Sequence, residues 1–173
     1  MKHTILMAVL GSTLMLTGCS DLVSLNPVAP DGASQFDPAL PGVWQGSDAL
    51  YVIRQDDSGY SVVYVGKEST KRLHGVLFQA GDAKLLDLVS EEEDPFQIPA
   101  HVVVRVWPEA AKLSWAFLDS DWFRQQAGTL NASQRAGERT LLTAPAPAVR
   151  GFVTKYAADE RAHGKPEVLD KVQ

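Results

Sequence analysis

Short apolar runs that alternate with polar residues, separated by turn residues, fill the middle of the chain. Residues 50–54 and 60–65 are rich in β-branched and aromatic side chains, and five polar or turn-forming residues join them. Residues 73–80 and 84–89 form a similar pair across Gly81-Asp82. Each pair predicts a β-hairpin, because a period of two with an intervening turn is the pattern of paired antiparallel strands.

The same period continues further along the chain. Residues 100–107 place one set of side chains on one face and another set on the opposite face: Val102, Val104 and Val106, against His101, Val103, Arg105 and Trp107. Residues 113–118 and 139–143 add two shorter runs. Six or seven strands joined mostly by tight turns predict an antiparallel meander, which closes into a small barrel or folds into a sandwich.

Two segments have a helical pattern. Ser120 is placed to cap a short helix that stops before Gly128. A second, amphipathic helix has Pro147 in its first turn and is ended by Gly164 and Pro166. It carries apolar residues at i, i+3, i+4 and i+7: Val149, Phe152, Val153 and Tyr156. We therefore predict a mainly β fold with a C-terminal amphipathic helix, and a loose tail over residues 164–173.

The first twenty residues have a different organisation. Lys2 precedes an apolar stretch, residues 5–16, which has the length of a signal-peptide core and is too short to span a bilayer. Leu16-Thr17-Gly18-Cys19 follows. This sequence resembles the lipobox of bacterial lipoproteins, and the resemblance implies that residues 1–18 are removed and that Cys19 carries the lipid.

Residues 19–41 contain four prolines and no sustained period, which predicts a flexible tether ahead of a β-rich domain over residues 42–163. The alternative is that its apolar residues pack on the domain: Leu22, Val23, Leu25, Phe36 and Leu40. The residue after the lipobox cysteine is Ser20 rather than an acid. By resemblance to the sorting rule of enteric bacteria, Ser20 implies an outer-membrane location with the domain in the periplasm.

Composition narrows the partners of this domain. Hydrophobic residues make up 45% and charged residues 21% of the 173-residue chain, as in an ordinary globular protein. The net charge is −5 and becomes −6 without Lys2, and no cluster of Lys and Arg suggests nucleic acid as a partner. Cys19 is the single cysteine, so the chain forms no internal disulfide.

Candidate chemistry is sparse. His74, His101 and His163 lack the local spacing of metal ligands, and the run Glu91 to Asp94 lacks the alternation and glycine of a calcium loop. Asp119 and Asp121 flank Ser120 and are interpreted as part of a helix cap. The sequence contains no nucleophile elbow and no phosphate loop, so we expect neither an enzyme nor a cofactor. If the protein were an enzyme, His101 and Asp121 would be the best catalytic candidates.

A three-residue motif adds a second resemblance. Gly42-Val43-Trp44 is similar to the Gly-x-Trp opening of lipocalins. It implies a Trp at the closed end of an eight-stranded barrel, packed against an Arg from a late strand, for which Arg139 is the candidate.

These observations lead to three hypotheses. The first is a membrane-anchored, non-catalytic binding or interaction module of the cell envelope, with an envelope protein as partner. The second is a lipocalin-like carrier of a small apolar ligand. The third is an envelope enzyme without a familiar motif.

Overall fold

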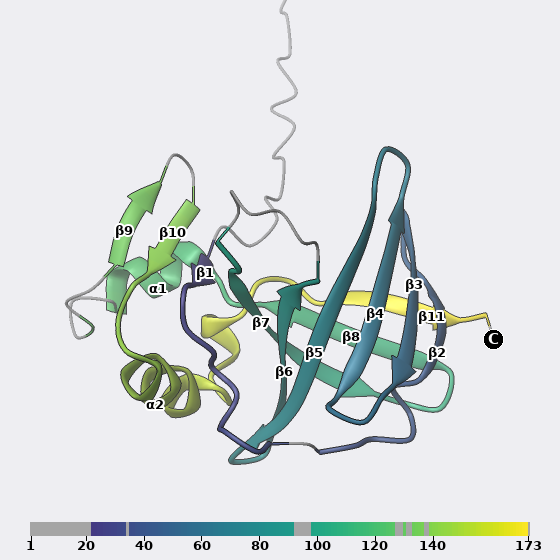
Figure 1. Cartoon of the computed structure of the whole chain (residues 1–173), viewed down its shortest axis with the longest axis horizontal. Helices are drawn as coiled ribbons and strands as arrows, with labels where there is room; N and C mark the ends of the chain where they lie inside the picture. The colour runs from purple at the N-terminus through teal and green to yellow at the C-terminus, as the bar shows by residue number, and fades with distance from the viewer. Residues whose placement is uncertain are drawn as a thin grey trace, which may run out of the picture.

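Eight strands form a closed antiparallel barrel in the computed structural model, which describes residues 22–33, 35–91, 98–126, 130, 133–136 and 139–172 (Figure 1). The barrel strands are β2 (Gly42–Gln45), β3 (Ala49–Gln55), β4 (Tyr60–Gly66), β5 (Thr70–Ala80), β6 (Ala83–Ser90), β7 (His101–Pro108), β8 (Lys112–Phe117) and β11 (Glu167–Lys171). Strands β2 to β8 follow one another as a meander, and β11 pairs with both β8 and β2 to close the ring. The predicted mainly β meander is therefore confirmed, and of its two expected forms, barrel and sandwich, the structure has the barrel.

The barrel interior is filled by large side chains. One cluster of buried residues lines it: Leu40, Trp44, Ile53, Tyr60, Val62, Leu77, Leu86, Leu88, Val104, Val106, Leu113, Trp115 and Leu169. Alternation explains the selection, since Val104 and Val106 face inward while Val103 and Arg105 face outward. The interior is thus a packed core, as in other small barrels.

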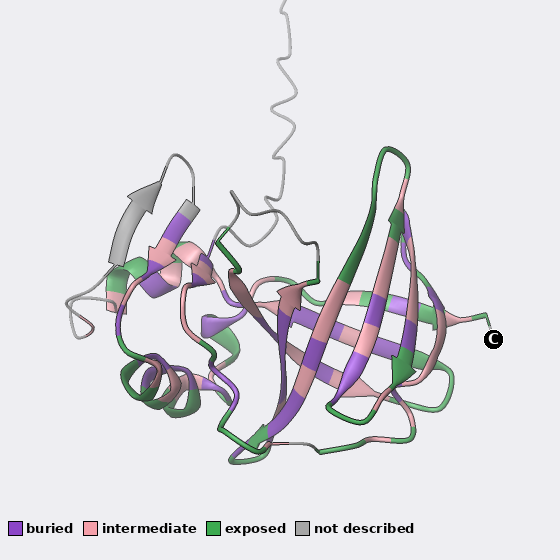
Figure 2. Cartoon of the chain, viewed as in Figure 1, coloured by how far each residue is buried: buried purple, intermediate pink, exposed green. Residues whose placement is uncertain are grey.

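A second apolar cluster lies outside the barrel wall. Helix α1 (Ser120–Gln126), helix α2 (Ala146–Tyr156) and the 3₁₀ helix η2 (Glu160–Ala162) gather on one side of the barrel together with strands β1 (Leu22–Ser24), β9 (Ser133–Ala136) and β10 (Arg139–Leu142) (Figure 1). Helix α2 buries three residues of the predicted stripe, Val149, Phe152 and Val153, and the fourth, Tyr156, is partly buried against the same cluster. Strand β6 is therefore covered on both faces, and Figure 2 shows buried residues along it.

The structure of the C-terminal segment differs from the prediction. Residues 164–173 were expected to be a loose tail, yet Glu167–Lys171 forms β11 and supplies Leu169 to the interior. Helix α2 ends at Tyr156 instead of continuing to Gly164. Strand β11 has only two apolar residues, Val168 and Leu169, so its local pattern does not reveal that two neighbouring strands pair with it.

The structure of the N-terminal segment also differs from the predicted flexible tether. Residues 22–33 and 35–41, here called the N-terminal strap, were expected to belong to a flexible tether but pack along the barrel. Leu22, Val28 and Leu40 are buried, and β1 pairs with β10 and with the start of β7. Prolines keep a chain extended, which suits a strap on a surface as well as a free linker.

Asp87 holds this strap in place. It is 4% exposed and lies on the outer face of β6. Asp87 Oδ2 accepts hydrogen bonds from the backbone N–H of Val28 at 2.7 Å and of Ala29 at 2.9 Å. Asp87 Oδ1 lies 3.0 Å from His101 Nδ1, and Arg150 donates to the carbonyl oxygens of Val28 and Ala29. The same stretch of strap is thus bonded on both its N–H and C=O groups.

We predict that Asp87→Ala lowers the free energy of unfolding by about 3 kcal/mol, because two buried N–H donors lose their acceptor. For a domain of this size the melting temperature should fall by roughly 6 to 12 °C, measured by circular dichroism. The control is Asp82→Ala in the exposed Gly81-Asp82 turn, which should change stability by less than about 0.5 kcal/mol. Equal melting temperatures for the two variants would contradict the role given to Asp87.

Candidate functional site

The three histidines lie in separate environments. His74 Nδ1 is 3.8 Å from Asp56, His101 binds Asp87, and His163 Nε2 is 3.0 Å from the carbonyl oxygen of Ala157. The described part of the chain has no group of three or more His, Cys, Asp and Glu residues placed to hold a metal ion. The histidines therefore do not converge on one site there.

The acidic candidates are also apart. Asp119 Oδ1 accepts from the backbone N–H of Trp122 at 2.7 Å, so Asp119 caps α1, one residue before the predicted cap Ser120. Asp121 is exposed and forms an ion pair with Arg124. Glu91 follows β6, whereas residues 92–94 of the acidic run lie outside the described residues. His101 and Asp121, the enzyme candidates, thus bond to different partners.

Trp44 of the Gly-Val-Trp motif lies in the barrel interior. It is fully buried, and its Nε1–H donates to the carbonyl oxygen of Leu40 at 2.9 Å. The cation over its ring is Lys171, with Nζ 5.0 Å from the ring centroid, because β11 places Lys171 opposite Trp44. Arg139, the sequence-based candidate, starts β10, which is not one of the barrel strands. The prediction that Arg139 packs against Trp44 was therefore wrong, because residues 167–171, which supply Lys171, were not predicted to form a strand.

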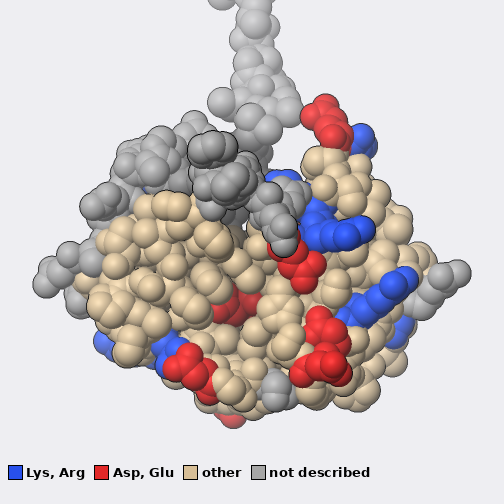
Figure 3. All heavy atoms as spheres, viewed as in Figure 1, with Lys and Arg blue, Asp and Glu red and all other residues tan. Residues whose placement is uncertain are grey.

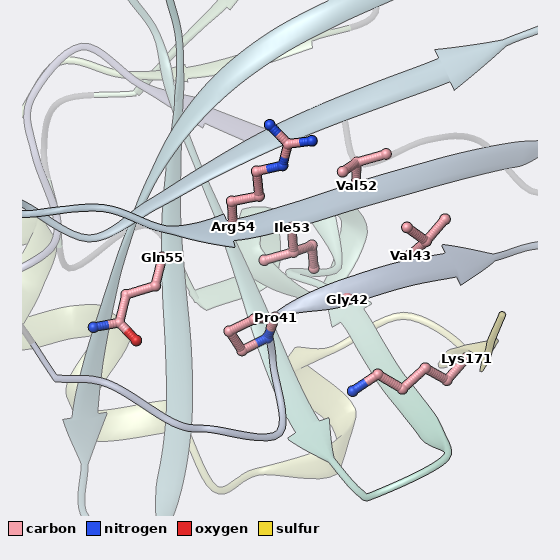
Figure 4. Close-up of a pocket in the computed structure, with 8 residues that line it drawn as sticks. All are labelled: Pro41, Gly42, Val43, Val52, Ile53, Arg54, Gln55 and Lys171. Carbon is pink, nitrogen blue, oxygen red and sulfur yellow. The ribbon is translucent and has the colours of Figure 1, made fainter. Parts of the chain in front are cut away.

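A groove of about 480 Å³ lies at the wall formed by β2 and β3, and we call it the β2–β3 groove. Its lining consists of Pro41, Gly42, Val43, Val52, Ile53, Arg54, Gln55 and Lys171. Val43 and Val52 come from neighbouring strands and lie side by side, and the Lys171 side chain extends along β2 toward Pro41 (Figure 4). This surface combines an apolar floor with two basic side chains.

The apolar floor continues across the outer wall of the barrel. Val43 pairs with Val52 and Val52 pairs with Val63, which places three valines in one row over β2, β3 and β4. In the next row Leu50 pairs with Val65, which is 39% exposed. Both described α-helices lie on the opposite side of the barrel (Figure 1), so this apolar wall faces outward.

The basic groups at the groove have no acidic partner within the described residues. Arg54 is exposed on β3 opposite Ser61, and Lys171 contacts the Trp44 ring. Some basic groups elsewhere form ion pairs, such as Lys84 with Asp37 and Lys67 with Asp48. On the face shown in Figure 3, Lys and Arg side chains are interspersed with Asp and Glu. The groove thus offers hydrocarbon contacts together with two cations available to an anionic group.

Ionic and polar contacts of Asp37 fix the strap just before Pro41, which lines the β2–β3 groove. Asp37 accepts from Lys84 Nζ at 2.6 Å and from the Ala39 N–H at 2.9 Å, and the Asp37 N–H donates to the Tyr60 hydroxyl at 2.6 Å. Burial alone would raise the pKa of Asp37, but these two bonds to its carboxylate outweigh it and hold the pKa below its usual value. Pro41, at one wall of the groove, is therefore held in position by the residues just before it.

The groove was not identified from the sequence. One signal could have revealed it: residues 50–53 are apolar at every position, which predicts a strand covered on both faces. The inward face, Tyr51 and Ile53, packs on the core, whereas the outward face, Leu50 and Val52, has no described helix over it. An apolar strand with one uncovered face marks a binding surface.

Comparisons of this chain with models of known protein families, with curated proteins and with solved structures give no match. Among the described residues, none of the helices has the length and apolar character needed to cross a bilayer.

We predict a pH effect from His163, which is 8% exposed. Burial lowers the pKa of His163 below its ordinary value of 6.5, with nearby Arg105 acting in the same direction. The unfolded chain then binds a proton at higher pH than the folded chain, so stability present above pH 6.5 is lost as the pH falls through the folded pKa. Urea unfolding between pH 8 and 5 should show this decline.

The matched variants are His163→Gln and His74→Gln. In His163→Gln the introduced side-chain amide can still donate to the Ala157 carbonyl oxygen but cannot titrate, so the decline below pH 6.5 should become shallower in this variant alone. His74 has a side chain that is 25% exposed and serves as the control. An unchanged slope in His163→Gln would contradict the assignment.

Proposed function

We propose that this protein is a non-catalytic binding module of the bacterial envelope, anchored to the outer membrane by lipid on Cys19 with its barrel in the periplasm. The lipobox-like Leu16-Thr17-Gly18-Cys19, preceded by Lys2 and an apolar stretch, supports the anchor. Two or three acyl chains on one cysteine hold a protein at a membrane durably, since each buried methylene contributes about 0.8 kcal/mol. The β2–β3 groove is the observation that supports binding.

The partner that best fits this groove is an envelope protein with an extended segment of apolar and acidic residues. Val43 and Val52 would contact apolar side chains, and Arg54 and Lys171 would contact carboxylates. The mature chain has a net charge of −6, so Arg54 and Lys171 at the groove contrast with the overall charge and would attract an acidic segment. Charge complementarity thus favours a single docking orientation.

The packed interior favours this proposal over a carrier. A ligand inside the barrel would have to displace Trp44 or Tyr60, which are both fully buried. Trp44 donates a hydrogen bond to the carbonyl oxygen of Leu40, and the Tyr60 hydroxyl accepts one from the Asp37 N–H. Native mass spectrometry of protein purified from its host separates the two. Added mass from a co-purified apolar molecule, beyond the lipid on Cys19, would favour the carrier.

We predict that Cys19→Ser abolishes membrane attachment. The wild-type protein should incorporate radiolabelled palmitate and sediment with membranes, because its acyl chains partition into the bilayer. The Cys19→Ser variant should incorporate none and move to the soluble periplasmic fraction. Sedimentation of the variant at the wild-type level would contradict the lipid anchor.

We predict a specific cross-link from the groove. A photo-crosslinking residue at Val43 should give one discrete adduct in host cells, and the same residue at exposed Gln79 should not. Arg54→Glu should reduce the Val43 adduct at least fivefold by removing a cation. Lys71→Glu, an equal charge change at an exposed residue outside the groove, should leave it unchanged. Equal adducts from both positions, or equal loss in both charge variants, would contradict binding at this groove.

A further inference from the structure

We infer that the lipid anchor holds the molecule directly against the bilayer by the end at which β1 begins, leaving the opposite end with the β2–β3 groove facing the periplasm. This inference rests on the proposed lipidation of Cys19. Only three peptide steps separate Cys19 from Leu22, the first residue of β1. Fully extended, they reach about 11 Å. A flexible tether over residues 19–41 would have allowed the domain to move far from the membrane.

The strap cannot lengthen this connection without losing a series of contacts. Leu22 is 4% and Ser24 3% exposed, and all three residues of β1 pair with β10. The Leu25 N–H donates to the carbonyl oxygen of Leu142 at 3.0 Å. Beyond it, the strap is bonded to Asp87 and Arg150. Releasing the strap would break several hydrogen bonds, each contributing about 0.5–1.5 kcal/mol, and would expose the buried side chains of Leu22 and Val28, so the docked length is the working length.

The position of β1 selects the end that meets the membrane. Ser24 pairs with His101 at the start of β7, and Ile98, which is 73% exposed, is three residues before His101. In Figure 1, strand β1 lies beside the start of β7, on the side of the barrel that carries the helices. The turn at Gly81-Asp82 lies at the other end of β6, whose first residue, Ala83, is seven residues from Ser90, or about 23 Å along the strand. Ile98 should therefore approach lipid, and Asp82 should not.

The groove lies away from the anchored end. Gly42 begins β2 and pairs with Ile53 near the end of β3, and Figure 1 places this part of the barrel at the lower right, distant from β1. An anchored molecule would then present Val43, Val52 and Arg54 to the aqueous side. The acidic residues near the anchored end, such as Glu91, would be repelled by anionic headgroups. Covalent attachment therefore has to hold this end in place.

The test uses the mature lipoprotein in vesicles of phosphatidylethanolamine and phosphatidylglycerol that contain a lipid with a nitroxide-labelled headgroup. Because Cys19 is the only cysteine and its sulfur is modified, Ile98→Cys and Asp82→Cys each provide a single free thiol for a fluorophore. We expect quenching at position 98 to be at least threefold greater than at position 82. Insertion of a ten-residue Gly-Ser segment between Asp21 and Leu22 should reduce this difference.

Two outcomes separate the inference from the proposed function. If the intact mass shows no lipid on Cys19 and the protein does not bind vesicles, the proposed function fails and the inference fails with it. If the protein is lipidated and vesicle-bound but the two labels are quenched equally, or position 82 is quenched more, the inference alone is overturned. A difference that is unchanged by the Gly-Ser insertion would also overturn it, because the short connection would then not be the cause.

Discussion

The arrangement of the N-terminal strap depends on the hydrogen bonds that the Asp87 carboxylate accepts from its backbone. A carboxylate buried on the outer wall of a barrel would be strongly unfavourable unless its oxygens were hydrogen-bonded. Two strap N–H groups and the His101 ring supply those bonds. The strap in turn brings Leu40 under the core, where its carbonyl oxygen accepts from Trp44. Asp87 therefore fixes the strap at Val28 and Ala29, and the contacts of Asp37 with Lys84 and Tyr60 fix it near the lower end of the barrel.

Part of this structure could be predicted from local sequence pattern. The alternation over residues 100–107 gave the inward and outward faces of β7 correctly, and the apolar stripe of Val149, Phe152 and Val153 gave the buried face of α2. These elements were found because each repeats its own period several times over a continuous segment. The short helix at Ser120–Gln126 was found through its polar cap, although the capping residue is Asp119.

The remaining elements depend on partners that are distant in the sequence. Asp87 bonds to residues 58 and 59 positions away, and Lys171 lies over Trp44 across the whole barrel sequence, so no local window contains these pairs. The groove was missed for a related reason. Val43 and Val52 look like ordinary core residues. Strand alternation places them on the outer wall, and they stay uncovered there because both described α-helices lie on the other side of the barrel. A strand pattern predicts a covered face but not what covers it.

The pairing of β11 with β2 sets the order in which the barrel can be completed. Lys171 pairs with Trp44, and the Val172 N–H donates to the carbonyl oxygen of Val43, so the ring closes between segments well over a hundred residues apart. Contacts of such long sequence separation form slowly, because a large loop must be ordered first. Until Glu167–Lys171 arrives, β2 and β8 both retain an open edge. If the chain were threaded through a membrane pore, the barrel would close only after this segment had crossed.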